Sequence, residues 1–236
     1  MAQGPIPFQI ALARRILARE GCESATAGQV SVRAPGEDAF WVSPFEYFDE
    51  SLPERVVKSS FDLQRLEGDW EPSPAVKFHA AFYRGRPDVN CVIHTHSHHA
   101  MVFATTGRPL GLYSDMSSIF LDEQAVYVED GARDPLDGAA MCSEVGAGHV
   151  VIMKNHGPIF LGSSIEQATV SAIAFEHAAR IQIEAEGIGG TEHPRQYAEW
   201  LKATYYDYYF PQMWAAGVRR LRRDDAEFFL HEPETV

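Results

Sequence analysis

The spacing of apolar residues along the chain changes repeatedly between a helical period and the alternation typical of strands. From Phe8 to Glu20, apolar side chains recur every three or four positions with arginines on the other face, which predicts an amphipathic helix. The same reasoning predicts helices that begin near residues 72 and 98, and helices over residues 136–145 and 163–186. Strands are expected over residues 30–33, 40–42, 92–96, 125–128, 150–153 and 160–162.

These elements predict one globular domain over residues 1–236, with a helical C-terminal extension from about residue 191. The extension holds more aromatic rings than a segment facing only solvent would carry: Trp200, Tyr205, Tyr206, Tyr208, Tyr209, Phe210 and Trp214. We expect these rings to be buried against the domain or against a neighbouring subunit.

Four histidines follow the apolar strand that begins at residue 92. Alternate side chains of an extended strand point to the same side, so His94 and His96 would aim their rings into one pocket. A second apolar strand, over residues 150–153, is followed closely by His156, which offers a third ring. Neutral imidazole is a common ligand of zinc, iron and manganese. The pattern therefore predicts a site for one divalent metal ion, Zn, Mn or Fe.

The overall composition limits the partners and the location of the chain. Its 20 basic and 33 acidic residues give a formal net charge of -13, which repels nucleic acid and anionic membranes. No run of 18 apolar residues and no signal-peptide pattern is present, and the three cysteines lack C-x-x-C spacing. We expect a cytoplasmic protein that has neither a nucleic-acid partner nor a membrane partner.

The order of several short motifs resembles that of the class II aldolase/adducin family. The matching stretches are residues 26–33, residues 72–79, residues 86–97, and Asn155-His156-Gly157-Pro158 with Gly162 and Glu166-Gln167-Ala168. The resemblance implies an α/β fold of three layers, in which helices flank a central and mainly antiparallel sheet. It also implies that His94, His96 and His156 bind the metal and that the active site lies between subunits of a homotetramer.

Three features depart from the sugar-phosphate aldolases of that family. Those aldolases have a Pro-Ser-Ser-Glu run whose glutamate binds the metal and transfers a proton, whereas this chain has Pro74 and Ala75 there. The family's phosphate pocket uses a Thr/Ser-Gly pair after the second strand, where this chain has Phe45 and Glu46, and Gln29 replaces the usual asparagine. Because Ala75 cannot move a proton and Glu46 would repel a phosphate, we predict a non-phosphorylated substrate.

The chemistry that survives these changes is a metal-dependent lyase reaction on a small 2-oxo, hydroxy or aromatic carboxylic acid. Three neutral histidines leave open positions on a divalent ion, where such an acid can bind through two oxygens. Decarboxylation needs no base to deprotonate a substrate hydroxyl, so it tolerates Ala75 better than retro-aldol cleavage does.

Five residues outside the histidines are candidates for the reaction or for substrate binding. Family aldolases use a loop tyrosine in the region of Tyr113, so Tyr113 and Asp115 are candidates for the return of a proton. The alternative is a packed tyrosine and a loop-capping aspartate. Gly28, Gln29 and Ser43 match the family's anion-binding loops and are candidates for substrate contacts.

Two other functions stay open. With iron(II), three histidines and open neighbouring positions can bind a substrate and O2 together, which describes an oxygenase acting on an aromatic or 2-oxo acid. The family that this chain resembles includes such oxygenases. Phe45, Tyr47 and Phe48 would suit an aromatic substrate. The third possibility is a non-catalytic, adducin-like binding protein, although a chain without activity has no reason to keep three converging histidines.

Overall fold

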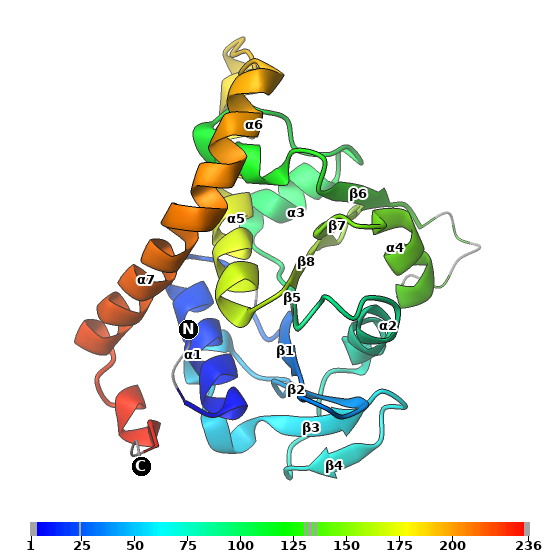
Figure 1. Ribbon diagram of the computed structural model, residues 1–236, viewed down its shortest axis with the longest axis vertical. Coiled ribbons are helices and arrows are strands. Elements are labelled where there is room, and N and C mark those ends of the chain that lie inside the picture. The colour runs from blue at the N-terminus through cyan, green and yellow to red at the C-terminus, as the bar shows by residue number, and fades with distance from the viewer. Residues whose placement is uncertain (1–3, 24, 130, 132–133, 135, 234–236) are drawn as a thin grey trace.

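The computed structural model describes residues 4–23, 25–129, 131, 134 and 136–233. At the centre is an eight-stranded sheet with the strand order β4-β3-β2-β1-β5-β8-β7-β6 (Figure 1). All neighbouring strands are antiparallel except β6 and β7, which are parallel. The strands are β1 (Gln29–Arg33), β2 (Ala39–Val42), β3 (Val57–Ser60), β4 (Arg65–Glu67), β5 (Cys91–His94), β6 (Gln124–Tyr127), β7 (Val150–Met153) and β8 (Gly157–Gly162). The expected α/β fold with a mainly antiparallel sheet is confirmed.

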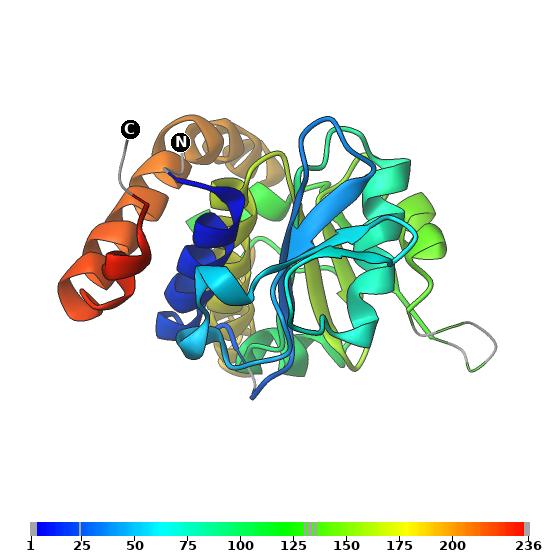
Figure 2. The ribbon, with the colours of Figure 1, turned by 90° about the horizontal axis from the view of Figure 1, so that it is seen from below.

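Helices cover both faces of the sheet and complete three layers (Figures 1 and 2). Side chains of β7 alternate between two apolar clusters, because successive residues of a strand point to opposite faces. One cluster joins the sheet to α1 (Ile6–Arg19), α3 (His98–Ala104) and α5 (Ile165–Gly187). The other joins it to α2 (Lys77–Gly85) and α4 (Gly138–Val145). With both faces covered, the strand ends and their loops are the places where polar side chains can meet a ligand.

Some boundaries differ from those that the sequence predicts. β3 and β4 lie outside the predicted strands, because β3 reads Val-Lys-Ser-Ser and all three residues of β4 are exposed. Neither strand has the apolar alternation that marks a half-buried strand. The helix expected near residue 72 begins as a 3-10 turn over Pro74–Val76 and becomes α-helical at Lys77, and α4 begins at Gly138.

The C-terminal extension is helical, as predicted. It consists of α6 (Arg195–Thr204), a π-helical segment (Tyr205–Tyr209) and α7 (Phe210–Asp224), which run end to end beside α5 and α1 (Figure 1). Phe210 and Trp214 are buried, but Trp200 and Tyr208 are each 63% exposed. Phe210 and Trp214 thus pack against the domain, and packing of Trp200 and Tyr208 against a neighbouring subunit stays a prediction.

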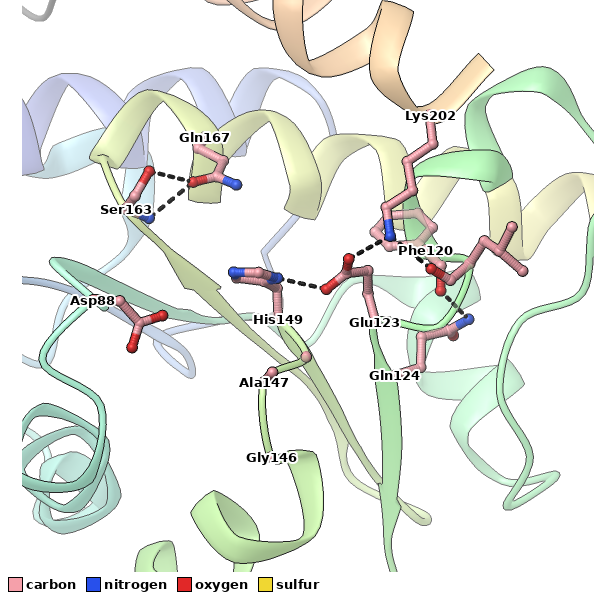
Figure 3. Close-up of polar contacts among 12 residues, drawn as sticks. Asp88, Phe120, Glu123, Gln124, Gly146, Ala147, His149, Ser163, Gln167 and Lys202 are labelled. Carbon is pink, nitrogen blue, oxygen red and sulfur yellow. Dashed lines mark hydrogen bonds and ion pairs between the residues drawn. The ribbon is translucent and has the colours of Figure 1, made fainter. Parts of the chain in front are cut away.

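Polar contacts anchor this extension to the rest of the molecule. Arg15 on α1 forms an ion pair of 2.6 Å with Asp225. Lys202 on α6 contacts Glu123, and the second carboxylate oxygen of Glu123 accepts a hydrogen bond of 2.5 Å from Nδ1 of His149 (Figure 3). We call Lys202, Glu123 and His149 the Glu123 cluster. It ties α6 to the beginning of β7.

The cysteines form no disulfide with one another: Cys22 and Cys91 are buried and Cys142 is partly exposed, and all three are free. Across the described ranges, none of the helices combines the length and the apolar character that a membrane span requires.

Candidate metal centre

Three histidine rings converge at one end of the sheet. His94 ends β5, His96 lies two residues further on, and His156 lies in the turn between β7 and β8. The ring centroids are 4.6 Å apart for His94 and His96, 4.9 Å for His96 and His156, and 5.1 Å for His94 and His156. One ring nitrogen from each side chain lies within 4.8 Å of the other two. The side chains therefore meet as their spacing suggests, while metal binding stays a prediction.

The turn that carries His156 depends on unusual backbone angles. Asn155 has a φ of 61°, in the left-handed region that asparagine adopts more readily than most residues. Gly157 follows, and a Cβ atom at that position would lie 2.7 Å from the carbonyl oxygen of Thr95 and 3.4 Å from the His96 ring. The missing side chain of Gly157 thus lets the turn approach the end of β5 closely enough to bring His156 to His96.

The hydrogen bonds of His94 suit a metal ligand. Its Nδ1–H donates to the carbonyl oxygen of Pro158 at 2.9 Å, which leaves Nε2 with a free lone pair. That Nε2 lies 2.8 Å from Nε2 of His96. Two neutral ring nitrogens at this distance share either a proton or a cation. Nitrogens bound at 2.0–2.1 Å to one tetrahedral ion lie about 3.3 Å apart, so small ring movements would fit this donor set to a divalent ion.

Burial keeps the three rings neutral. It holds the pKa of His94 well below its usual value, and the neighbouring His96 and His156 rings lower that pKa further. Burial also lowers the pKa of His96 to about 4 and shifts the pKa of His156 downward. Neutral imidazole is the form that binds a metal, so the lowered pKa values favour the metal-binding form of all three rings.

Several buried polar atoms near His94 have no hydrogen-bond partner in the described part of the chain. They include Oε1 of Gln29 and Nε2 of His79. Gln29 lies opposite His94 in the pairing of β1 with β5, and His79 is held through its Nδ1 by the Ser31 hydroxyl at 2.7 Å. An unsatisfied buried polar group costs about 1–3 kcal/mol. The position of these atoms beside the rings therefore indicates that a ligand or water forms hydrogen bonds with them.

The predicted substrate contacts have two different environments. Gly28 has a φ of 98°, and a Cβ atom there would lie 2.7 Å from the carbonyl oxygen of His94. Gly28 and Gln29 are therefore beside the candidate centre. Ser43 is fully buried, and its Oγ accepts a hydrogen bond of 3.2 Å from the backbone N–H of Val30. The Ser43 side chain thus fixes β1 against β2, and substrate contact by all three residues stays a prediction.

Tyr113 and Asp115 make their contacts elsewhere on the chain. The Tyr113 hydroxyl is hydrogen-bonded to Glu186 at the end of α5. Asp115 lies 3.3 Å from Nε2 of His193, in the segment before α6. The partners of both residues therefore belong to α5 and to the start of the extension rather than to the three histidines. Proton return by either residue stays a prediction.

Glu46 is turned into the protein. Its carboxylate is 3% exposed and pairs with Arg14 at 3.1 Å and with Arg55 at 2.9 Å. The buried Arg14 guanidinium also donates to the carbonyl oxygens of Pro44 and Glu46. A carboxylate paired with two guanidinium groups presents little charge to a pocket, so the predicted repulsion of phosphate by Glu46 is wrong. Phe45 still replaces the family's hydroxyl, and it is 57% exposed.

A polar cavity of about 200 Å³ opens beside His156. It is lined by Tyr127, Glu129, Met153, Lys154, Asn155 and His156. The sequence predictions include neither Glu129 nor Lys154, and the clue to both is their position directly after a predicted strand. Two larger cavities, of about 620 and 390 Å³, lie along α7 and have mainly apolar walls.

Known protein families include one whose pattern covers most of this chain. The family described as "Class II Aldolase and Adducin N-terminal domain" matches residues 8–183. The chain belongs to the class II aldolase and adducin family. The match includes all three histidines of the candidate centre, and it confirms the resemblance drawn from the motifs.

Relatives in the class II aldolase and adducin family have diverse names. A 5-deoxy-D-ribulose 1-phosphate aldolase from Bacillus thuringiensis is 31% identical over 175 residues, covering 72% of this chain and 80% of that protein. The meiotically up-regulated gene 14 protein from Schizosaccharomyces pombe is 28% identical over 199 residues, covering 78% and 75%. The crystal structure of an aldolase II superfamily protein from Pseudomonas syringae has a TM-score of 0.84 at 24% identity, with 94% of each chain covered.

Two further class II aldolase and adducin relatives are named for other reactions. A 3,4-dihydroxyphthalate decarboxylase from Arthrobacter keyseri is 29% identical over 196 residues, covering 77% of this chain and 79% of that protein. A 4-hydroxy-3-prenylphenylpyruvate oxygenase/4-hydroxy-3-prenylbenzoate synthase from Streptomyces roseochromogenus is 27% identical over 196 residues, covering 79% and 70%. Similarity at this level gives the family, and the reaction has to be argued from the site.

Proposed function

We propose that the chain is a divalent-metal-dependent lyase acting on a small non-phosphorylated 2-oxo, hydroxy or aromatic carboxylic acid, by decarboxylation or by cleavage of another carbon–carbon bond. The observation that carries this proposal is the set of three neutral, converging ring nitrogens from His94, His96 and His156. Relatives named as an aldolase and as a decarboxylase support the lyase class.

In this proposal each residue near the centre has a separate task. The three histidines hold one ion of Zn, Mn or Fe, and the Pro158 carbonyl keeps His94 in the tautomer that exposes Nε2. A bound divalent ion polarises the substrate carbonyl and stabilises the negative charge that develops as the bond breaks. The Gln29 side chain, whose Oε1 has no partner in the described chain, binds a polar group of the substrate.

The residue at position 75 favours decarboxylation over retro-aldol cleavage. Retro-aldol cleavage requires a base that removes a hydroxyl proton, and the family's sugar-phosphate aldolases have a glutamate where this chain has Ala75. Decarboxylation breaks the bond to a carboxylate first and requires a proton on carbon only afterwards. The loss of a hydroxyl at Phe45 also supports a substrate without phosphate.

We also propose that the active site is completed in a homo-oligomer, a tetramer by family resemblance. Trp200 and Tyr208 leave aromatic surface uncovered on the extension, as expected of a surface that packs against another subunit. Tyr113 and Asp115 have their contacts away from the histidines of their own chain, so they could return a proton only in the site of a neighbouring subunit. The proposed location is the cytoplasm, and the net charge of -13 argues against nucleic-acid or membrane partners.

An iron(II) oxygenase acting on an aromatic or 2-oxo acid is the second candidate, and the named oxygenase relative favours it. Phe45 and Tyr47 are 57% and 48% exposed and are free to meet an aromatic guest. Phe48 is not, because it is buried and packs against the Gly28 position. A non-catalytic, adducin-like binding role is the weakest candidate, because it gives no reason for three converging rings.

Product release distinguishes these candidates. Metal-loaded protein is incubated with a panel of 2-oxo, hydroxy and aromatic acids and, separately, with sugar phosphates, while CO2, aldehyde and O2 are followed. We expect CO2 or aldehyde from a non-phosphorylated acid, and loss of that activity in His94→Ala. Cleavage of sugar phosphates alone would contradict the proposed substrate class. Consumption of O2 in step with product would replace the lyase by the oxygenase.

A further inference from the structure

The polar cavity beside His156 is lined by a carboxylate, that of Glu129, which the family motifs do not include. Glu129 follows β6, which runs parallel to β7 with Tyr127 opposite Met153. Parallel pairing brings the residues that follow the two strands to the same end of the sheet. Glu129 and the turn from Lys154 to His156 consequently line one cavity of about 200 Å³.

Within the part of the chain that the structure describes, the Glu129 carboxylate has no partner, whereas carboxylates nearby are engaged. Asp134, further along the same loop, pairs with Lys77 at 2.6 Å. Glu123, just before β6, belongs to the Glu123 cluster. Across the described ranges of the chain, no hydrogen bond or ion pair holds the Glu129 side chain, which is exposed. A free carboxylate on a cavity wall is available to a ligand.

Glu129 lines the cavity without belonging to the set of converging metal-binding atoms. Among the described residues, that set contains only His94, His96 and His156, whose nitrogens lie within 4.8 Å of one another. Of these three histidines only His156 lines the cavity, so a small substrate inside it would lie between the Glu129 wall and the His156 side of the candidate centre. This is the arrangement that a general acid–base group requires.

We propose that Glu129 carries the proton to and from the substrate carbon, a task for which Ala75 offers no group; the proposal rests on the lyase function proposed above. As the bond to the leaving carboxylate breaks, CO2 departs and the bonding electron pair forms an enolate. Glu129 gives a proton to the carbon, and the carboxylate regains a proton from water. Lys154 lines the same cavity and supplies positive charge for a substrate carboxylate.

The proton transfer can be measured on the metal-loaded full chain with pyruvate and phenylpyruvate in D2O as probes. Exchange of the protons next to the carbonyl is followed by NMR, and here the Glu129 carboxylate removes a proton and returns a deuteron. We expect Glu129→Gln to slow the exchange by about 100-fold or more, and Asp134→Asn to stay within about twofold of wild type. Asp134→Asn is the matched control, because it removes a paired carboxylate from the same loop.

Metal content and oxalate binding give a second readout that does not depend on turnover. Oxalate is a planar analogue of the enolate of a 2-oxo acid. Glu129→Gln should keep its metal and bind oxalate at least as tightly as wild type, because a negative charge beside the dianion is removed. His94→Ala should lose the metal and the oxalate binding together.

The outcomes separate the role of Glu129 from the function as a whole. The role of Glu129 would be overturned if Glu129→Gln exchanged protons as fast as Asp134→Asn. If His94→Ala had lost both proton exchange and oxalate binding in the same experiment, the lyase function would still stand. Loss of metal from Glu129→Gln would also overturn the role of Glu129. If Tyr113→Phe alone abolished exchange, the proton would belong to Tyr113. If wild type neither exchanged the probes nor bound oxalate, the lyase function and the role of Glu129 would fall together.

Discussion

Strand β7 has a histidine near each end, and the two histidines have opposite surroundings. His149, directly before the strand, donates to Glu123 at 2.5 Å, and Glu123 also contacts Lys202 (Figure 3). His156, three residues after the strand, lies among the neutral rings of His94 and His96. The first histidine has a charged partner within the chain, and the second converges, among the described residues, with two other neutral rings and no charged group.

This difference shows how the partners of a histidine decide its use. A ring that donates to a carboxylate, itself paired with a lysine, belongs to a network that is complete within the chain and fixes α6. A ring whose nitrogen converges with two other neutral nitrogens is incomplete until a cation or a proton joins them. The Glu123 cluster is therefore structural in this interpretation, and the other end of β7 is the site of chemistry.

Replacing His156 and His149 separately by alanine should give the largest difference in turnover. His156→Ala is expected to lower turnover of the substrate found in the product-release screen by about 1000-fold or more, because several kcal/mol of metal-derived stabilisation are lost. His149→Ala should leave turnover nearly unchanged and lower the melting temperature instead. Values of kcat/KM for both variants test this contrast, and equal losses of activity would contradict it.

The close approach of β1 to β5 should make Gly28→Ala the most destabilising of the small substitutions. The new Cβ would meet the His94 carbonyl oxygen and the Phe48 ring, in addition to the cost of a left-handed φ. We expect a loss of about 3 kcal/mol in the free energy of unfolding, measured with urea. Gly36→Ala is the matched control, with a φ of 76° and nothing within 4 Å. It should lose about 1 kcal/mol, and equal losses would refute the steric argument.

Mild acid should destabilise the histidine end of the sheet through His79. Burial lowers the pKa of His79 from 6.5 to about 3, so below pH 6.5 the unfolded chain binds a proton that the folded chain does not. The stability from neutral His79 is thus complete above pH 6.5 and is lost as the pH falls toward 3. At pH 5 the loss is about 2 kcal/mol. Urea unfolding at pH 7.5 and pH 5 should show a smaller drop in His79→Gln, and an equal drop would count against this cause.

The Glu123 cluster should give the smallest of these effects. Glu123→Gln weakens the bonds to His149 and Lys202 at a partly buried position, and we expect a loss of about 1–2 kcal/mol in unfolding free energy with the metal retained. Glu199→Gln removes an exposed partner of Arg195 and should change the stability by less than about 0.5 kcal/mol. Loss of metal from Glu123→Gln would show that the two ends of β7 are not independent.

Much of the fold could be predicted from the sequence because its interior elements have strong apolar patterns. The continuous run of β7 and the helical period of α1 are examples, since each stays buried along one or both faces. β3 and β4 could not be predicted in this way, because β3 continues from Val57 with a lysine and two serines and all three residues of β4 are exposed. A hydrophobic pattern marks a strand only where the buried side chains are apolar.

The residues of the candidate site likewise differ in whether local sequence or tertiary structure determines their position. The spacing of His94 and His96 is local and predicts their common direction, and the family motif adds His156. The orientation of Glu46 depends on Arg14, a residue of α1 that is distant in sequence, so no pattern around position 46 reveals it. The position of Glu129 beside His156 depends on the parallel pairing of β6 and β7, which is likewise a tertiary feature.

Elemental analysis of protein purified anaerobically tests the metal centre most directly, with wild type, His94→Ala and His149→Ala measured side by side. The prediction is close to one divalent ion per chain in wild type and in His149→Ala, and none in His94→Ala. Zinc or manganese would support the lyase, and iron would favour the oxygenase. A wild-type protein without metal, or a His94→Ala variant that keeps it, would contradict the three-histidine centre and every reaction proposed for it.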